Sequence, residues 1–124
     1  MKRNYDIGLL VLRIGMAALM LTHGIPKFMA FIGGDLSVVG DPLGIGGMLT
    51  SILVLLGELV APVLIIIGIK TRFAAVASAI TMAVAAFVVH GADPLAKKEM
   101  ALLYLIGFLS IALMGAGSIS VDKK

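Results

Sequence analysis

Four apolar segments, each about as long as a membrane-spanning helix, occupy most of this sequence. They run over residues 7–28, 48–69, 73–89 and 98–114, and a helix that crosses a bilayer needs about 20 mostly apolar residues. The whole chain is 60% hydrophobic and 14% charged, a composition outside the range of soluble domains. The sequence therefore predicts an all-α integral membrane protein, a four-helix bundle that forms a single transmembrane domain over residues 1–124.

The connections between these segments have turn composition. Residues 33–47 are rich in Gly and hold Asp35, Asp41 and Pro42, which makes them the longest predicted loop. Lys70-Thr71-Arg72 predicts a tight polar connection between the second and third helices, residues 91–94 a short loop, and Gly115 the end of the fourth helix.

Basic residues predict how the helices are oriented. Six of them would fall on one side of the membrane: Lys2, Arg3, Lys70, Arg72, Lys123 and Lys124. The opposite side would hold Lys27, Lys97 and Lys98. The positive-inside rule then predicts that both termini face the cytoplasm and that both longer loops face the outer side. Because these residues lie at segment edges and form no basic patch, nucleic acid is not expected as a partner.

A short sequence echo relates the two halves of the chain. His23-Gly24 is followed by Asp41-Pro42-Leu43, and His90-Gly91 by Asp93-Pro94-Leu95. Both pairs fall on the predicted outer side. Two tandem helical hairpins would produce such a pattern, as in other membrane folds built from parallel repeats.

Ionisable residues inside the predicted spans are the strongest indication of a functional site, since each costs roughly 2.5–3.5 kcal/mol at a helix centre. Glu58 would lie near the bilayer middle, roughly 16 Å from either end of its helix. Arg13 would lie about 9 Å into the first helix, and we expect it to pair with Glu58. This pair would either fix the packing of the helices or hold a ligand or a proton at Glu58.

A second group of polar residues would lie nearer the outer side. His23 and Lys27 are four residues apart and share one helix face, and His90 has a similar depth. With Asp41 or Asp93 above and Glu58 below, they would form a small polar cavity in an apolar wall, the usual form of a ligand site. In the alternative interpretation Lys27 extends to the membrane interface and the His residues end helices. No spacing of metal ligands is present, so no metal site is predicted.

The absence of cysteine limits the chemistry of the chain. It supplies no thiolate, no disulfide and no iron–sulfur ligand of its own. Any redox reaction would therefore use a bound cofactor or a partner subunit. The residues leave open whether the chain is itself an enzyme.

Several short motifs, in order along nearly the whole chain, resemble the DoxX family of small four-helix membrane proteins. They are Leu12-Arg13-Ile14-Gly15, His23-Gly24-Ile25-Pro26-Lys27, Gly57-Glu58-Leu59, Gly68-Ile69-Lys70-Thr71-Arg72, His90-Gly91 and Lys97-Lys98-Glu99. The resemblance implies a multi-pass protein of the bacterial inner membrane, in a family often labelled as oxidoreductases. It links relatives to quinone-coupled thiosulfate oxidation, to catechol or quinone resistance and to oxidative stress. Thiosulfate oxidation is not expected here, because those relatives use a partner subunit and periplasmic segments with no obvious equivalent in this chain.

The residues and the resemblance together lead to one main hypothesis. A quinone or a similar amphipathic redox ligand would bind within the bundle, with Glu58 and His23 as the catalytic residues that exchange protons. The expected ligand-binding residues are Arg13, Lys27, His90, Asp41 and Asp93. The alternatives are a non-enzymatic membrane partner or assembly subunit, and a small-molecule carrier, which would need to form a homo-oligomer.

Overall fold

The computed structural model describes residues 2–36 and 39–123, and their regular structure is entirely helical. The elements are α1 (Lys2–Ile32), α2 (Gly47–Leu55), η1 (Leu56–Val60), α3 (Ala61–Ile67), α4 (Thr71–Val84), η2 (Ala85–Val89) and α5 (Leu95–Met114). The two η elements are single π-helical stretches. Since α2, η1 and α3 follow one another without a break, as do α4 and η2, the chain forms four long helical rods, as the sequence predicts.

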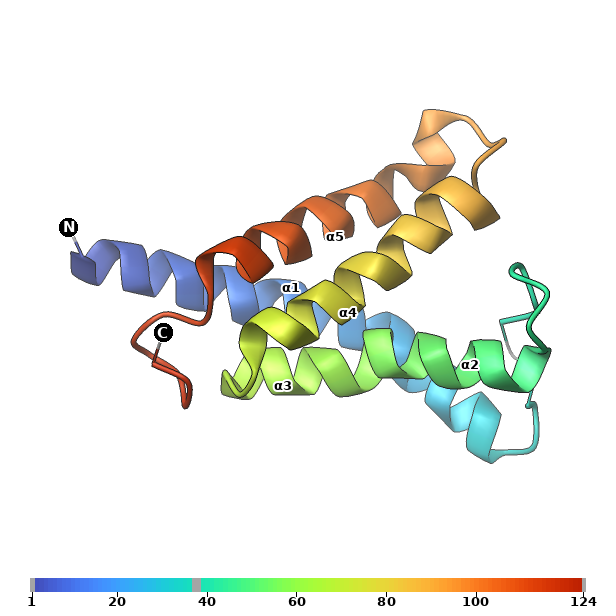
Figure 1. Ribbon diagram of the computed structural model, residues 1–124, viewed down its shortest axis with the longest axis horizontal. Coiled ribbons are helices and arrows are strands. Elements are labelled where there is room, and N and C mark those ends of the chain that lie inside the picture. The colour runs from blue at the N-terminus through green and yellow to red at the C-terminus, as the bar shows by residue number, and fades with distance from the viewer. Residues whose placement is uncertain (1, 37–38, 124) are drawn as a thin grey trace.

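The rods are arranged as two hairpins. In the first, α1 packs against η1 and α3; in the second, α4 packs along α5. The hairpins meet where α4 contacts α3 and η1 and where α1 contacts α5. Figure 1 shows both termini and the α3–α4 turn at one end, and the loops that follow α1 and η2 at the other. We call these the terminal end and the loop end.

Within residues 2–36 and 39–123, three helical segments are long and apolar enough to cross a membrane: Arg3–Ile32, Gly47–Ile67 and Thr71–Val89. The fourth rod, α5, begins with a polar stretch that contains Lys97, Lys98 and Glu99. Its apolar part, residues 100–114, is about 22 Å long at 1.5 Å per residue. The chain is thus a helical membrane bundle in which the charged start of α5 shortens the apolar part of that rod.

The first helix is longer than the apolar run predicts, because nothing at either end interrupts it. It includes Lys2 and Arg3 at the start, passes through Pro26 and continues to Ile32. At the connection between α3 and α4, Gly68 ends α3 with φ 85°, a left-handed conformation that suits glycine.

Small side chains on α4 allow close packing at the centre of the fold. Ala74, Ala75, Ser78 and Ala79 are all buried there. The three alanines pack with larger core residues from the other rods, including Met20, Ile65 and Phe108. Close approach through small residues is the usual way in which helices associate in lipid.

Two arginines bind the carbonyl ends of helices at the terminal end. Arg13, 1% exposed, donates hydrogen bonds to Ile65 and Ile66 in α3 and to Ala116 and Ile119 in the C-terminal segment, at 2.8–3.1 Å. Arg72 donates to carbonyls at the end of α5, the shortest bond being 2.9 Å to Leu113. The expected Arg13–Glu58 pair is therefore wrong, because the helix termini and the C-terminal segment hold the Arg13 guanidinium.

Candidate functional site

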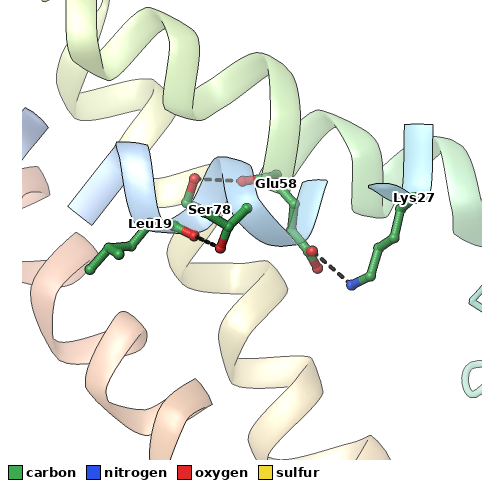
Figure 2. Close-up of polar contacts among 6 residues, drawn as sticks. Leu19, Lys27, Glu58 and Ser78 are labelled. Atoms are coloured by element: carbon green, nitrogen blue, oxygen red, sulfur yellow. Dashed lines mark hydrogen bonds and ion pairs between the residues drawn. The ribbon is translucent and has the colours of Figure 1, made fainter. Parts of the chain in front are cut away.

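The buried carboxylate of Glu58 pairs with Lys27 at the α1–η1 contact. The Nζ–Oε1 distance is 2.7 Å, and 5% of the Glu58 side chain is exposed against 35% of the Lys27 side chain (Figure 2). A buried carboxylate needs a counter-charge. Lys27 supplies it from about four turns beyond Arg13 along α1.

A local break in helical hydrogen bonding surrounds Glu58. In η1 the N–H of Ala61 donates to the Leu56 carbonyl, which lies five residues earlier. The next donor in this pattern would be Pro62, which has no N–H, so the π-helical pattern offers no donor to the Gly57 carbonyl. The Ser78 hydroxyl of α4 donates to it instead at 2.7 Å (Figure 2). Such π-helical stretches are frequent at functional sites.

Two glycines allow three rods to meet at Glu58. A side chain at Gly24 of α1 would collide with the backbone carbonyl of Glu58, and one at Gly57 would collide with the Thr81 side chain of α4. Because backbone atoms cannot move aside as easily as a side chain, Gly24 tolerates a larger residue less well than Gly57 does. The glycines therefore bring α1 and α4 against η1, where the carboxylate lies.

A cavity of about 530 Å³ adjoins the ion pair and extends toward the loop end. Lys27, Gly57 and Glu58 line its inner part, and α2, α4 and η2 form its walls. The walls are mostly apolar, with the hydroxyl residues Thr50 and Thr81 among them. This volume lies within the range of about 300–1,000 Å³ that small-molecule sites occupy.

The loop before α2 covers the loop end of this cavity. Val39, Pro42, Leu43 and Ile45 contribute to the lining, whereas Asp41 holds the loop in place. Its carboxylate accepts hydrogen bonds from the N–H groups of Ile45 at 2.9 Å and Gly46 at 3.0 Å. The bond from Gly46 is the main cause that lowers the pKa of Asp41 below its usual value. Asp41 is thus a loop-forming residue in this structure.

The two histidines lie in different places. His90, which ends η2, lines the cavity, and its Nδ1 lies 2.8 Å from an Asp93 carboxylate oxygen. His23 is not among the lining residues; its ring meets Tyr104 of α5 edge-on, with centroids 5.7 Å apart. The structure therefore brings Lys27, Glu58 and His90 to one cavity, with Asp93 beside His90. It places His23 against α5 and Arg13 at the terminal end.

Sequence reasoning did not identify Thr50, Thr81 and Ser78 as parts of this site. Thr50 and Thr81 line the cavity, and Ser78 supports the backbone next to Glu58. The available signal was a hydroxyl residue inside an apolar helix. That signal is weak, because such residues often bond to their own helix, as Thr81 does to the Ala77 carbonyl at 3.0 Å.

Comparison with known proteins gives a consistent family assignment. An uncharacterized protein of Haemophilus influenzae is 36% identical, covering 91% of this chain and 87% of its own length. "Inner membrane protein YqjF" of Escherichia coli is 30% identical over 99% of this chain and 95% of its own. "Putative oxidoreductase CatD" of Bacillus subtilis is 27% identical over 98% of this chain and 90% of its own length. No solved structure matches. The DoxX family model matches residues 8–91, and the chain therefore belongs to the DoxX family.

Proposed function

We propose that this chain is a quinone-linked component of a membrane redox system and binds a quinone or similar amphipathic redox molecule in the cavity at Glu58. The observation that carries the proposal is the Lys27–Glu58 ion pair at the inner part of an apolar cavity of about 530 Å³. The name of the Bacillus subtilis relative agrees with a redox role.

The cavity offers the groups that quinone chemistry uses. Reduction of a quinone to a quinol takes up two electrons and two protons, one on each ring oxygen. Lys27 would donate a hydrogen bond to one oxygen, and Glu58 would exchange a proton there. His90, whose imidazole also lines the cavity, would exchange the second proton.

The electrons would come from a partner subunit or from a soluble donor, since the chain has no cysteine to supply them. By the positive-inside rule, the terminal end would face the cytoplasm of a bacterium and the cavity would lie toward the outer side of the inner membrane. A redox partner would then dock on the bundle or in the membrane beside it.

Ligand content of the purified protein tests this function. The wild-type protein and Glu58→Gln are purified in the same mild detergent, and bound quinone is extracted and quantified by mass spectrometry and ultraviolet absorption. We expect near-stoichiometric quinone in the wild type and a loss of at least tenfold, about 1.4 kcal/mol, in Glu58→Gln. Glu99→Gln is the matched control, because Glu99 is exposed on α5 and does not line the cavity.

Lys27→Gln should lower quinone content in the same way, with Lys97→Gln as its control. Folding is checked by circular dichroism and gel filtration. If wild-type protein is folded but holds no quinone and binds none when it is added, the proposal is wrong and a non-enzymatic partner subunit becomes the better explanation. The same holds if Glu58→Gln lowers only the unfolding temperature and leaves bound quinone unchanged.

A further inference from the structure

Polarity changes across the cavity from its charged inner part to the largely aliphatic side between α2 and α4. The charged groups, Lys27 and Glu58, lie where α1 meets η1, whereas the described lining of α2 and α4 is largely aliphatic. A ligand that fits this gradient has a polar head and an apolar remainder. Burial of its polar end without hydrogen-bond partners would cost several kcal/mol, so the head must lie at the ion pair.

Apolar side chains of the loop before α2 cover part of the loop end of the cavity, where His90 also lies. Pro42, Leu43 and Ile45 lie there, and the hydrogen bonds to Asp41 keep this loop in a defined conformation. Thr50, a residue of α2 that lines the cavity, also donates a hydrogen bond to the Asp41 carboxylate at 3.2 Å. The loop therefore places apolar side chains between this part of the cavity and the aqueous side of the membrane.

The side of the cavity between α2 and α4 is different. The α4 rod contacts α3 and η1 near the terminal end and then diverges from α2 toward the loop end (Figure 1). We call the opening between them the seam; Leu53 and Leu56 form one edge, and Ile80 and Val89 the other. All four line the cavity, yet they are 46–60% exposed on the surface of the bundle. In a membrane, exposed aliphatic side chains at this depth contact lipid chains.

We propose that the ligand is a quinone with a long isoprenoid tail, which enters sideways from the lipid and leaves its tail in the seam. This inference rests on the proposed function and specifies its ligand class. A cavity of about 530 Å³ holds the ring and the first part of the tail, and the rest must leave it. The seam lets the tail stay in hydrocarbon while the ring reaches Lys27 and Glu58.

Two probes with the same benzoquinone ring, one with a long isoprenoid tail and one without a tail, test the inference. Their binding is compared in lipid nanodiscs at equal concentration in the lipid phase. Ile80→Trp and Leu53→Trp narrow the seam from its two edges, and Leu109→Trp is the control because Leu109 is exposed on α5 and outside the cavity. We expect each seam variant to weaken the tailed probe at least tenfold and the tailless probe less than twofold.

The outcomes separate the inference from the proposed function. If both probes bind the wild type and the seam variants weaken both equally or neither, the seam is not the path of the tail, while quinone binding stands. If neither probe binds the folded wild type, the proposed function fails and this inference fails with it. The control variant should bind both probes as the wild type does.

A second measurement does not depend on any added ligand. The natural chain has no tryptophan, so Ile80→Trp has a single fluorescent indole at the seam. In nanodiscs, we expect lipids with brominated acyl chains to quench it by at least twofold and aqueous iodide to have little effect. Strong quenching by iodide without quenching by the brominated lipids would show that the seam faces water, which would overturn the proposal.

Discussion

Arg13 and Glu58 are both buried charges, but different groups satisfy them. Arg13 donates to four backbone carbonyls, two in α3 and two in the C-terminal segment. Glu58 instead has a side-chain cation beside a cavity. Arg13 therefore joins helix ends, whereas the Lys27–Glu58 pair is the one that a ligand could reach.

Replacement of Arg13 should destabilise the fold. Hydrogen bonds to a charged group contribute about 1.5–3 kcal/mol each, and Arg13→Met would leave four carbonyls without this donor. We expect the free energy of unfolding in detergent to fall by at least about 3 kcal/mol, as measured by denaturant titration. Arg3→Met, at an exposed position of α1, should change it by less than about 0.5 kcal/mol. Equal effects of the two would contradict the structural role of Arg13.

Two glycines of α1 should respond in opposite ways to alanine. At Gly24 a methyl group would collide with the Glu58 backbone, whereas at Gly15 it would meet nothing within 4 Å. Gly24→Ala should therefore lower the free energy of unfolding by about 1–3 kcal/mol. Gly15→Ala should leave it unchanged or raise it by up to about 1 kcal/mol. Thermal unfolding followed by circular dichroism distinguishes them, and a stable Gly24→Ala would show that α1 does not approach η1 this closely.

At the scale of elements, η1 depends on a partner from another rod. Ser78→Ala would leave the buried Gly57 carbonyl without its donor, and an unsatisfied buried group costs about 1–3 kcal/mol. We expect the unfolding free energy to fall by that amount. Ser110→Ala is the matched control, because the Ser110 hydroxyl bonds only to Ile106 of its own helix among the contacts described. If the control loses as much, the Ser78–Gly57 bond has no special role.

The loop before α2 should depend on pH through Asp41. Hydrogen bonding lowers the pKa of Asp41 in the folded loop, so its contribution is fully present above the unfolded pKa of about 3.9. It is lost as pH falls through the lower folded pKa. Hydrogen exchange of the Ile45 and Gly46 amides should lose protection in that acidic range. Asp41→Asn should remove this pH dependence, whereas Asp6→Asn, at the terminal end, should preserve it.

At the scale of the whole molecule, the arrangement of the ends predicts the topology. The chain has no cysteine, so Asn4→Cys and Ala92→Cys each introduce a single reactive thiol at exposed positions of opposite ends. We expect a membrane-impermeant maleimide added to bacterial cells with a permeabilised outer membrane to label Ala92→Cys, and to label Asn4→Cys only after lysis. The reverse pattern would invert the proposed orientation.

Much of this architecture could be predicted from the sequence because the membrane imposes strong rules. Apolar length indicates the rods, and Lys70-Thr71-Arg72 and the Gly-rich stretch indicate turns.

The partner of Glu58 could not be predicted, because Arg13 and Lys27 both lie on α1, about 21 Å apart, and the sequence does not show which one reaches η1. The carbonyls that bind Arg13 belong partly to residues 116 and 119, which lie beyond the predicted end of the fourth helix at Gly115. Pro62 indicates a missing hydrogen bond, but not that Ser78 replaces it.

The divergence of the α4–η2 rod from α2 also means that a small tilt of this rod at the terminal end produces a larger displacement at the loop end. Arg13 and Arg72 hold the helix ends together at the terminal end, so rotation of the α4–η2 rod there is magnified at the loop end. Over 19 residues from Thr71 to Val89, the arm is roughly 28 Å, and a tilt of about 5° would move its far end by about 2.5 Å. Adjustments too small to break the arginine contacts would therefore change the width of the seam by most of an atom's diameter.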